Sequence, residues 1–431
     1  MSNADRTSHP VAAVVQSFFA KEPRYIFERL TGSGAFGVTL CYRNDWHRPG
    51  ENPRFVVKTV ASDHDTLGNE IAILKRLQWA KHIVSILGIN PDPLNNRRFG
   101  REYLITEYIP NGTLGEFLER FRYGTRNERP PNRILWAVFL CLVRAVVALA
   151  YPPIVRRGKP VNERNKIFET IPTGTNAPAP SYLAHNDFHS GNLMFGDVGE
   201  TAQPVSEAKG LRGWFFPSQP QPSSTLETQE HTLIPILKLI DFGEADDLAP
   251  KYPADQEEEA LNELVVLATG LLGRPPTTSM AKITPQDIID GFDSALALAA
   301  PAEAETTGAG QLQANNLAVN KNIYDIGVAM MQQLFLPGFH HAQSERIISL
   351  IKDKRGGNLR DPDLDFDLLM LITCCMASDT NNRPRLAWLL STLETHALSR
   401  NEDFYAGIEE ETDEAISRLV QSYILNPGPK L

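Results

Sequence analysis

The chain has 431 residues, of which 42% are hydrophobic and 22% charged; this composition is typical of a soluble globular protein long enough to form two hydrophobic cores. Its net charge of −10 argues against a nucleic-acid partner, because nucleic-acid binding usually requires a basic surface. The four cysteines form neither a disulfide framework nor a zinc-ligand pattern with histidines, which indicates a reducing compartment, cytoplasmic or nuclear.

The chain opens with an extension, residues 1–26, and continues with short predicted strands around a glycine-rich turn. Residues 25–30 and 38–42 flank the turn, and a valine-rich third strand covers residues 54–60. Because glycines let backbone N–H groups approach phosphate oxygens closely, the turn is a candidate phosphate-binding loop, although alone it fits an ordinary hairpin equally well. Its residues are Gly32, Ser33, Gly34, Ala35, Phe36 and Gly37.

Lys58 follows the apolar run of the third strand, where a buried lysine is disfavoured unless it has a partner. A helix predicted from apolar residues at helical spacing over residues 67–77 carries Glu70, which supplies that partner. We expect the pair to direct the ammonium group toward nucleotide phosphates; the alternative is a strand-end lysine that extends into solvent. Two further strands, residues 83–89 and 102–107, complete a small sheet with one helix.

Beyond residue 108 the chain is mainly helical. Residues 134–151 are apolar enough to resemble a membrane span, but Arg144 favours a helix buried in a protein core, with the arginine turned to its edge, and hence no membrane. Within the later stretches we expect a mobile proline-rich loop, and an amphipathic helix over residues 257–272. The stretches that interrupt the pattern are residues 152–180, 196–232 and 246–320.

Residues 185–192, with the sequence His-Asn-Asp-Phe-His-Ser-Gly-Asn, are the strongest single indication of chemistry. The spacing of Asp187 and Asn192 suits an aspartate that accepts a hydroxyl proton and an asparagine that coordinates a metal. His185 is expected to brace this loop through hydrogen bonds and to take little direct part in catalysis.

A second metal ligand is predicted at the end of the apolar strand that covers residues 236–240. This strand delivers Asp241, the first residue of an Asp-Phe-Gly sequence, and the hard Mg²⁺ ion prefers carboxylate oxygen. Together with Lys58, Asp187 and Asn192, this residue predicts a site for ATP and Mg²⁺, with Asn192 and Asp241 as the metal ligands.

In this order the motifs resemble those of the eukaryotic protein kinase superfamily, over about residues 27–395. The resemblance implies an α+β, two-lobed, protein-kinase-like fold. Its small N-lobe, residues 27–108, would contain an antiparallel sheet with one helix. Its large, mainly helical C-lobe, residues 109–395, would carry the three insertions, and a helical tail, residues 396–431, would follow.

The resemblance also places further residues around the nucleotide. Residues 102–114 look like a kinase hinge, whose backbone would meet the adenine at Glu107, Tyr108 and Ile109. Thr39 and Val56 would lie beside the nucleotide, with Val56 narrowing the pocket. The sequence from residue 323 to 328 resembles the start of the central buried helix of the family, and the sequence from residue 382 to 384 resembles its closing Arg-Pro motif.

Several positions depart from the family pattern. Asn186 replaces an arginine that binds a phosphorylated activation loop in many kinases, and His189 stands where a lysine is usual. Asn322 stands where the central helix usually begins with aspartate, so its bonds to the catalytic loop would be neutral. The loop also resembles that of aminoglycoside and choline phosphotransferases, and no Ala-Pro-Glu motif is evident.

Three hypotheses follow. The first is a protein kinase that transfers the γ-phosphate of MgATP to Ser or Thr hydroxyls of a protein substrate. The second is a pseudokinase that binds protein partners through the C-lobe insertions. The third, suggested by His189 and the absence of the docking motif, is a small-molecule phosphotransferase.

Overall fold

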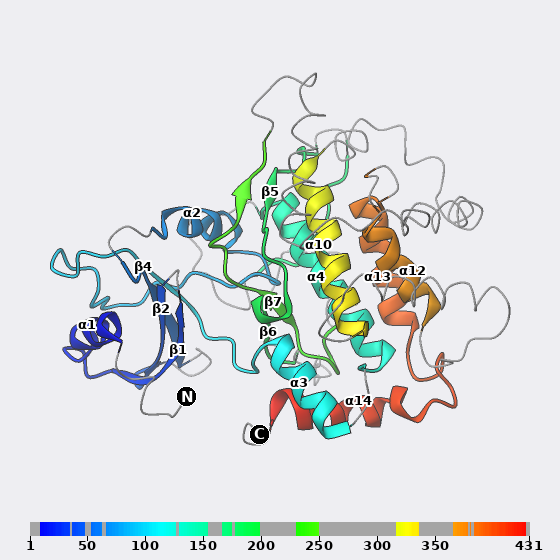
Figure 1. Ribbon diagram of the computed structural model, residues 1–431, viewed down its shortest axis with the longest axis horizontal. Coiled ribbons are helices and arrows are strands. Elements are labelled where there is room, and N and C mark those ends of the chain that lie inside the picture. Colours follow the sequence, from blue (N-terminus) through cyan, green and yellow to red (C-terminus); the bar gives the residue numbers. More distant parts are fainter. Residues whose placement is uncertain are drawn as a thin grey trace, which may run out of the picture.

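A small antiparallel sheet lies at one end of this α+β protein, and long helices fill the other end (Figure 1). The α+β class predicted from the sequence is confirmed at this level. The computed structural model describes residues 9–34, 37–47, 53–62, 66–125, 129–153, 166–174, 177–198, 230–249, 316–335, 365–377, 380 and 383–427. The predicted proline-rich loop and the helix predicted over residues 257–272 lie outside these ranges.

The sheet has four strands in the order β1-β2-β3-β4, and each pairs with its neighbour in antiparallel fashion. A fifth strand, predicted at residues 83–89, does not form. Its second half joins β4 only through an isolated bridge at Ile86, because its first half bonds instead to Leu239 in the helical part of the protein. The strands are β1 (Tyr25–Gly34), β2 (Gly37–Asn44), β3 (Arg54–Thr59) and β4 (Tyr103–Glu107).

A helix covers the outer face of this sheet, within the residues predicted to be an extension. It is α1 (Pro10–Phe19), and its buried side chains form a separate hydrophobic core with alternate residues of the strands. The Phe19 ring stacks on that of Tyr42 with centroids 4.1 Å apart. The second helix of this region, α2 (Gly68–Leu77), carries Glu70. Among the described residues of the predicted N-lobe, 27–108, α2 is the one helix, as expected. The helix within the predicted extension was not expected, although the apolar spacing of α1 indicates it.

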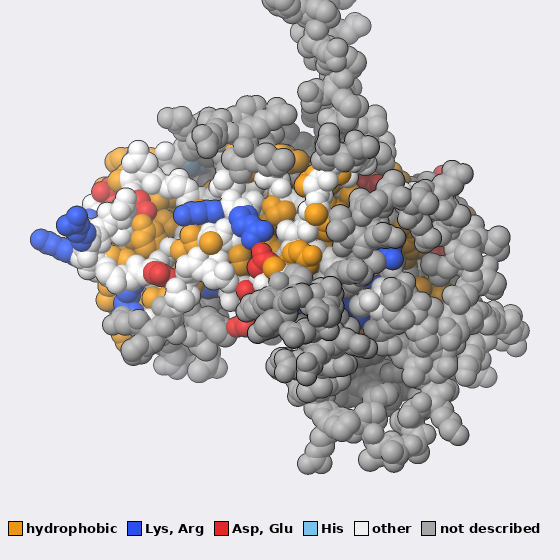
Figure 2. All heavy atoms as spheres, turned by 90° about the horizontal axis from the view of Figure 1, so that it is seen from above, with side chains coloured by type: hydrophobic (Ala, Val, Ile, Leu, Met, Phe, Trp, Pro, Cys, Tyr) orange, Lys and Arg blue, Asp and Glu red, His pale blue; other side chains and the backbone are white. Residues whose placement is uncertain are grey.

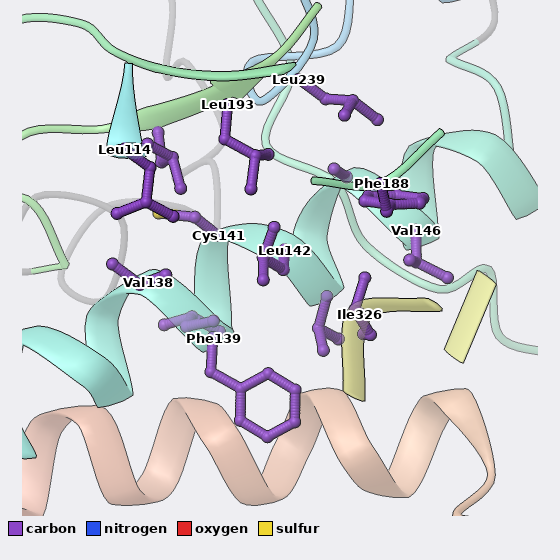
Figure 3. Packing of buried hydrophobic residues seen from close by; sticks show 14 of the residues in the cluster. Leu114, Val138, Phe139, Cys141, Leu142, Val146, Phe188, Leu193, Leu239 and Ile326 are labelled. Carbon is purple, nitrogen blue, oxygen red and sulfur yellow. The ribbon is translucent and has the colours of Figure 1, made fainter. Parts of the chain in front are cut away.

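The helical part is built around α4 (Asn132–Ala150), whose residues are buried almost without exception. Among the described residues it is the one helix long and apolar enough to cross a membrane, and most of that stretch is buried inside the protein. Figure 3 shows side chains of α4 packed against residues of neighbouring loops, strands and helices, among them Leu193, Leu239 and Ile326. The other helices among the described residues are α3 (Leu114–Thr125), α10 (Leu317–Phe335), α12 (Phe366–Cys375), α13 (Leu386–Ser399) and α14 (Asp413–Val420).

The sequence suggested that Arg144 lies at the edge of α4, but the structure buries it. Its side chain is only 3% exposed, and its guanidinium group lies 2.5 Å from Glu230 and 2.7 Å from Glu394. It also donates a hydrogen bond to the backbone carbonyl of Glu169. The arginine is tolerated in the core because carboxylates from distant segments neutralise it.

Short paired strands connect the segments that carry the predicted chemistry. β5 (Leu183–Ala184) pairs with β8 (Asp246–Asp247), and β6 (Leu193–Phe195) pairs with β7 (Leu237–Leu239). A 3₁₀ turn, η3 (Ser190–Asn192), leads into β6. Because these pairs straddle residues 185–192 and 240–245, they hold the two loops side by side.

The C-terminal residues belong to the same core as α4. Helix α13 continues past residue 396, and Ile416 and Val420 of α14 lie in the main hydrophobic cluster. Glu411 is buried and accepts hydrogen bonds from the first backbone N–H groups of α4, at Asn132 and Arg133. The remaining short elements are η7 (Glu409–Glu411) and the π-helical turn η8 (Gln421–Leu425).

The face of the molecule seen in Figure 2 carries basic and acidic side chains close to one another among hydrophobic ones. On the described part of this face, basic side chains do not form a continuous patch.

One glycine of the candidate phosphate loop is required by packing. Gly37 begins β2 with φ at 145°, and a Cβ atom there would lie 2.3 Å from the Thr59 carbonyl oxygen. We expect Gly37→Ala to lower the free energy of unfolding by about 1–3 kcal/mol, measured in urea. Gly32→Ala is the control, since its Cβ would meet only the Thr39 side chain at 3.7 Å. Equal stability of the two variants would contradict this account.

Candidate functional site

Lys58 is the centre of the site and binds two carboxylates. Its Nζ atom lies 2.8 Å from Oε2 of Glu70 and 2.8 Å from Oδ1 of Asp241. The alternation of β3 turns Lys58 away from the core that α1 covers, and the first turn of α2 presents Glu70 to it. The structure thus brings together the predicted lysine and glutamate, with side-chain exposures of 16% and 4%.

The charges within this group stabilise one another. Burial alone would lower the pKa of Lys58, but the carboxylates of Glu70 and Asp241 raise it above its ordinary value. Burial would raise the pKa of Asp241, but the Lys58 ammonium and its hydrogen bond hold that pKa below its usual range. At neutral pH the site therefore contains an ammonium ion and an ionised Asp241 carboxylate.

A buried aromatic ring positions Asp241. Phe242 is fully buried and meets the His185 ring edge to face, with centroids 4.8 Å apart. Asp241 adopts a left-handed backbone conformation, with φ at 58°, and Gly243 donates its backbone N–H to the carboxylate. A non-glycine residue in this conformation costs about 1–2 kcal/mol, and such strain occurs preferentially at functional sites.

The loop of residues 185–192 is braced by His185, as expected. Nδ1 of its ring accepts the backbone N–H of Asp187 at 3.3 Å, and Nε2 donates to the Ile240 carbonyl at 3.1 Å. Burial lowers the pKa of this histidine to about 4, so the ring is neutral at physiological pH. His185 therefore ties the backbone of Asp187 to the strand that delivers Asp241.

Asp187 and Asn192 lie in direct contact. The Asn192 amide nitrogen donates to Oδ2 of Asp187 at 2.8 Å and to its backbone carbonyl at 3.1 Å. The Asn192 backbone carbonyl accepts from Ile240, which links the loop to the end of β7. The amide nitrogen is thereby engaged, which leaves the amide oxygen as the atom that Asn192 can offer a metal ion.

Helix α10 supports this loop through neutral hydrogen bonds, as the sequence predicted for Asn322. The Asn322 side chain accepts the His185 backbone N–H at 3.1 Å and donates to the Leu183 carbonyl at 2.9 Å. Asn186 has φ at 65° and donates to the Glu244 carbonyl. His189 lies with Nε2 at 3.5 Å from Oδ2 of Asp187.

The structure describes most of the residues expected to lie around a nucleotide. Thr39 and Lys58 are register partners in β2 and β3, and Val56 lies two residues before Lys58, so the three share the inner face of the sheet. Gly32 and Ser33 are exposed at the end of β1. Ala35 and Phe36 lie outside the described residues, and Gly34 and Gly37 pair across the turn.

Glu107 uses its backbone N–H within the protein, and the expected contact of the backbone at Glu107, Tyr108 and Ile109 with an adenine stays a prediction. That N–H donates to the Ser85 carbonyl, and the side chain is buried between Lys166 at 2.7 Å and Lys238 at 2.8 Å. Burial would raise the pKa of Glu107, but the two ammonium groups hold it far below its usual range. Tyr108 accepts a hydrogen bond from Arg29 through its hydroxyl group, and Ile109 is buried.

Sequence reasoning missed both lysine partners of Glu107. Lys238 is a lone charge in an apolar strand, a signal of the same kind as that of Lys58. Lys166 falls within the first predicted insertion, and nothing nearby in the sequence marks it. The Arg-Pro motif was recognised, but its contacts were not: Arg383 donates to the backbone carbonyls of Asn320 and Ala377.

The site thus pairs the Lys58 ammonium group with Asp241 and the Asp187 carboxylate with the Asn192 amide. Carboxylate and amide oxygens are the kind of atom that a hard cation such as Mg²⁺ prefers. Phosphate oxygens bind such groups in phosphoryl transfer. No protein-family model and no curated protein matches this chain.

Proposed function

We propose that this chain is an ATP-dependent kinase of the protein-kinase type, with a two-lobed fold and a nucleotide site between the sheet and the helical part. The main observation behind the proposal is that Lys58 binds both Glu70 and Asp241. Lys58 and Asp241 are 183 residues apart in the sequence. A hydrophobic core of its own between α1 and the sheet supports a distinct N-terminal lobe, while α2 and Leu104 of β4 pack into the main core with the helices.

The proposed acceptor is the hydroxyl of Ser or Thr in a protein substrate. Asp187 would orient this hydroxyl and accept its proton, and Lys58 would bind the α- and β-phosphates of ATP. Asn192 and Asp241 would hold Mg²⁺, which supplies charge neutralisation at the phosphates when bound. The contribution of these residues is chiefly position and charge, because phosphoryl transfer needs little covalent chemistry from a protein.

A small-molecule acceptor is the second candidate, and one contact favours it. Nε2 of His189 lies 3.5 Å from Oδ2 of Asp187, where the lysine usual in Ser/Thr kinases would stand. Asn186 makes a neutral contact with the Glu244 carbonyl in place of the phosphate-binding arginine of many kinases. Both features agree with a phosphotransferase that acts without activation-loop phosphorylation.

The proposal predicts that MgATP raises the melting temperature of the protein and that the γ-phosphate is transferred to an added acceptor. Lys58→Met is expected to reduce transfer at least about 100-fold, because the phosphates lose their cation and two carboxylates lose their partner. Transfer is measured with labelled ATP and three acceptors in parallel: Ser/Thr peptides, an aminoglycoside and choline. Lys75→Met, at an exposed position on α2, is the matched control.

The outcomes separate the hypotheses. Transfer to peptides alone supports a protein kinase, and transfer to a small molecule alone supports the second candidate. Binding of MgATP without transfer to any acceptor would identify a pseudokinase and overturn the proposed activity. Equal transfer by Lys58→Met and wild type would contradict the assigned role of the lysine.

A further inference from the structure

A cluster of potential metal ligands is buried in the core. His82 follows α2, Cys141 belongs to α4 and His231 precedes β7; their ligand atoms all lie within 4.8 Å of one another. All three side chains are buried. Figure 3 shows the position of Cys141 on α4, near Leu142 and below Leu193. None of these residues takes part in the proposed phosphoryl transfer.

Glu169 fixes the orientation of His82. Oε2 of the glutamate lies 2.7 Å from Nδ1 of His82, and Oε1 accepts the His82 backbone N–H. When Glu169 is ionised, Nδ1 must carry a proton, and in the neutral ring the lone pair is then on Nε2. A carboxylate behind a ligating imidazole is the usual outer partner of a metal-bound histidine.

The two imidazoles are spaced as neighbouring zinc ligands are. Nε2 of His82 lies 3.3 Å from Nε2 of His231. With Zn–N bonds of about 2.05 Å, tetrahedral geometry separates two ligand nitrogens by about 3.3 Å. Nδ1 of His231 meets no partner with hydrogen-bond geometry among the described residues, although the Ile234 backbone lies nearby.

Cys141 supplies the third ligand atom. Burial raises the pKa of its thiol to about 12, while the Leu237 backbone N–H forms a hydrogen bond that favours the thiolate. A bound metal would displace the thiol proton, which leaves to solvent. Tetrahedral zinc with a Zn–S bond of about 2.3 Å needs nitrogen-to-sulfur distances of about 3.5 Å. The ligand atoms lie within 4.8 Å of one another, so side-chain displacements on the order of 1 Å would complete the contact.

The surrounding charges also suit a divalent cation. The thiolate and the Glu169 carboxylate together carry two negative charges, which a Zn²⁺ ion would neutralise. Arg144 is paired with two carboxylates, Glu230 and Glu394, so its charge does not oppose a cation at the cluster. Buried charges are stable when they are compensated in this way.

We propose that His82, Cys141 and His231 bind one zinc ion, with Glu169 orienting His82. Two nitrogens and one sulfur form a donor set that suits zinc, and a water molecule would complete the tetrahedron. The ion joins the segment between α2 and β4 to α4 and to the residues that lead into β7. The rival arrangement is a hydrogen bond between neutral imidazoles, with a free thiol beside them.

The test uses the full-length protein, without a histidine tag, expressed in zinc-supplemented medium. Elemental analysis is expected to find about one zinc ion per chain after dialysis. Refolding with Co²⁺ is expected to give an intense sulfur-to-cobalt charge-transfer band. Cys141→Ser should lose the band and most of the zinc. Cys374→Ser, which alters another buried cysteine, is the matched control and should retain both.

Zinc-free wild-type protein after both expression and refolding would overturn the proposal, as would equal metal content in Cys141→Ser. If Cys141→Ser fails to fold, as judged by circular dichroism, the zinc content of His231→Gln is compared with that of the wild type instead. The result is independent of phosphoryl transfer, because Asp187→Asn is expected to keep its zinc. Loss of phosphoryl transfer therefore does not imply loss of zinc binding, and loss of zinc binding does not imply loss of phosphoryl transfer.

Discussion

Replacement of Asp187 by asparagine is expected to reduce phosphate transfer by about 10²–10⁴-fold and to leave MgATP affinity within a few-fold. The amide keeps the shape of the carboxylate, and its oxygen still accepts from Asn192, so the loop keeps its geometry. What it loses is the basic oxygen that orients the acceptor hydroxyl. The turnover number with labelled ATP and the dissociation constant from a binding titration together measure this difference.

Asp197→Asn is the control for this variant. Asp197 lies on the exposed connection after β6, so the substitution makes the same chemical change outside the site. Its turnover is expected to equal that of the wild type. Undiminished turnover in Asp187→Asn would refute the role of Asp187, and a parallel loss of nucleotide binding would show that the variant had disturbed the loop instead.

Replacement of Arg144 by methionine is expected to lower the free energy of unfolding by about 3–5 kcal/mol. The guanidinium group pairs with Glu230, whose side chain is 0% exposed, and with Glu394. Methionine fills a similar volume but leaves the Glu230 carboxylate buried without a counter-charge. Urea unfolding followed by circular dichroism measures the change, and an unfolding free energy within about 1 kcal/mol of wild type would contradict it.

Two variants separate charge from packing at this position. Adding Glu230→Gln to Arg144→Met removes the stranded charge, so the double variant is expected to be more stable than Arg144→Met alone. Arg418→Met removes an exposed arginine from α14 and is expected to change stability by less than about 0.5 kcal/mol.

Local patterns allowed the sequence to predict much of the site. Lys58 interrupts an apolar strand, Glu70 follows on the next helix, and residues 185–192 carry their chemistry within one short loop. Each of these signals depends on neighbours a few positions away, and the structure brings them together. The strands β1 to β4 were likewise readable from short apolar runs around glycine.

Long-range partnerships could not be predicted in this way. His82 and His231 meet although they are 149 positions apart, and Arg144 meets Glu394 across 250 positions. Zinc sites are recognised in sequence by closely spaced ligands, a criterion that His82, Cys141 and His231 do not meet. The ion pairs of the buried Glu107 side chain could not be predicted for the same reason, since both of its lysine partners lie at least 59 positions away.

The segment that failed to become a fifth strand limits how the sheet can move. Leu239 accepts from the Val84 backbone N–H and donates its own to the His82 carbonyl, while Leu87 donates to Ile105 in β4. One short stretch of backbone is therefore bonded to both parts of the protein at once. If the sheet opens or closes over a nucleotide, it has to rotate about residues 82–87 relative to the helical part, because a sliding motion would break these hydrogen bonds.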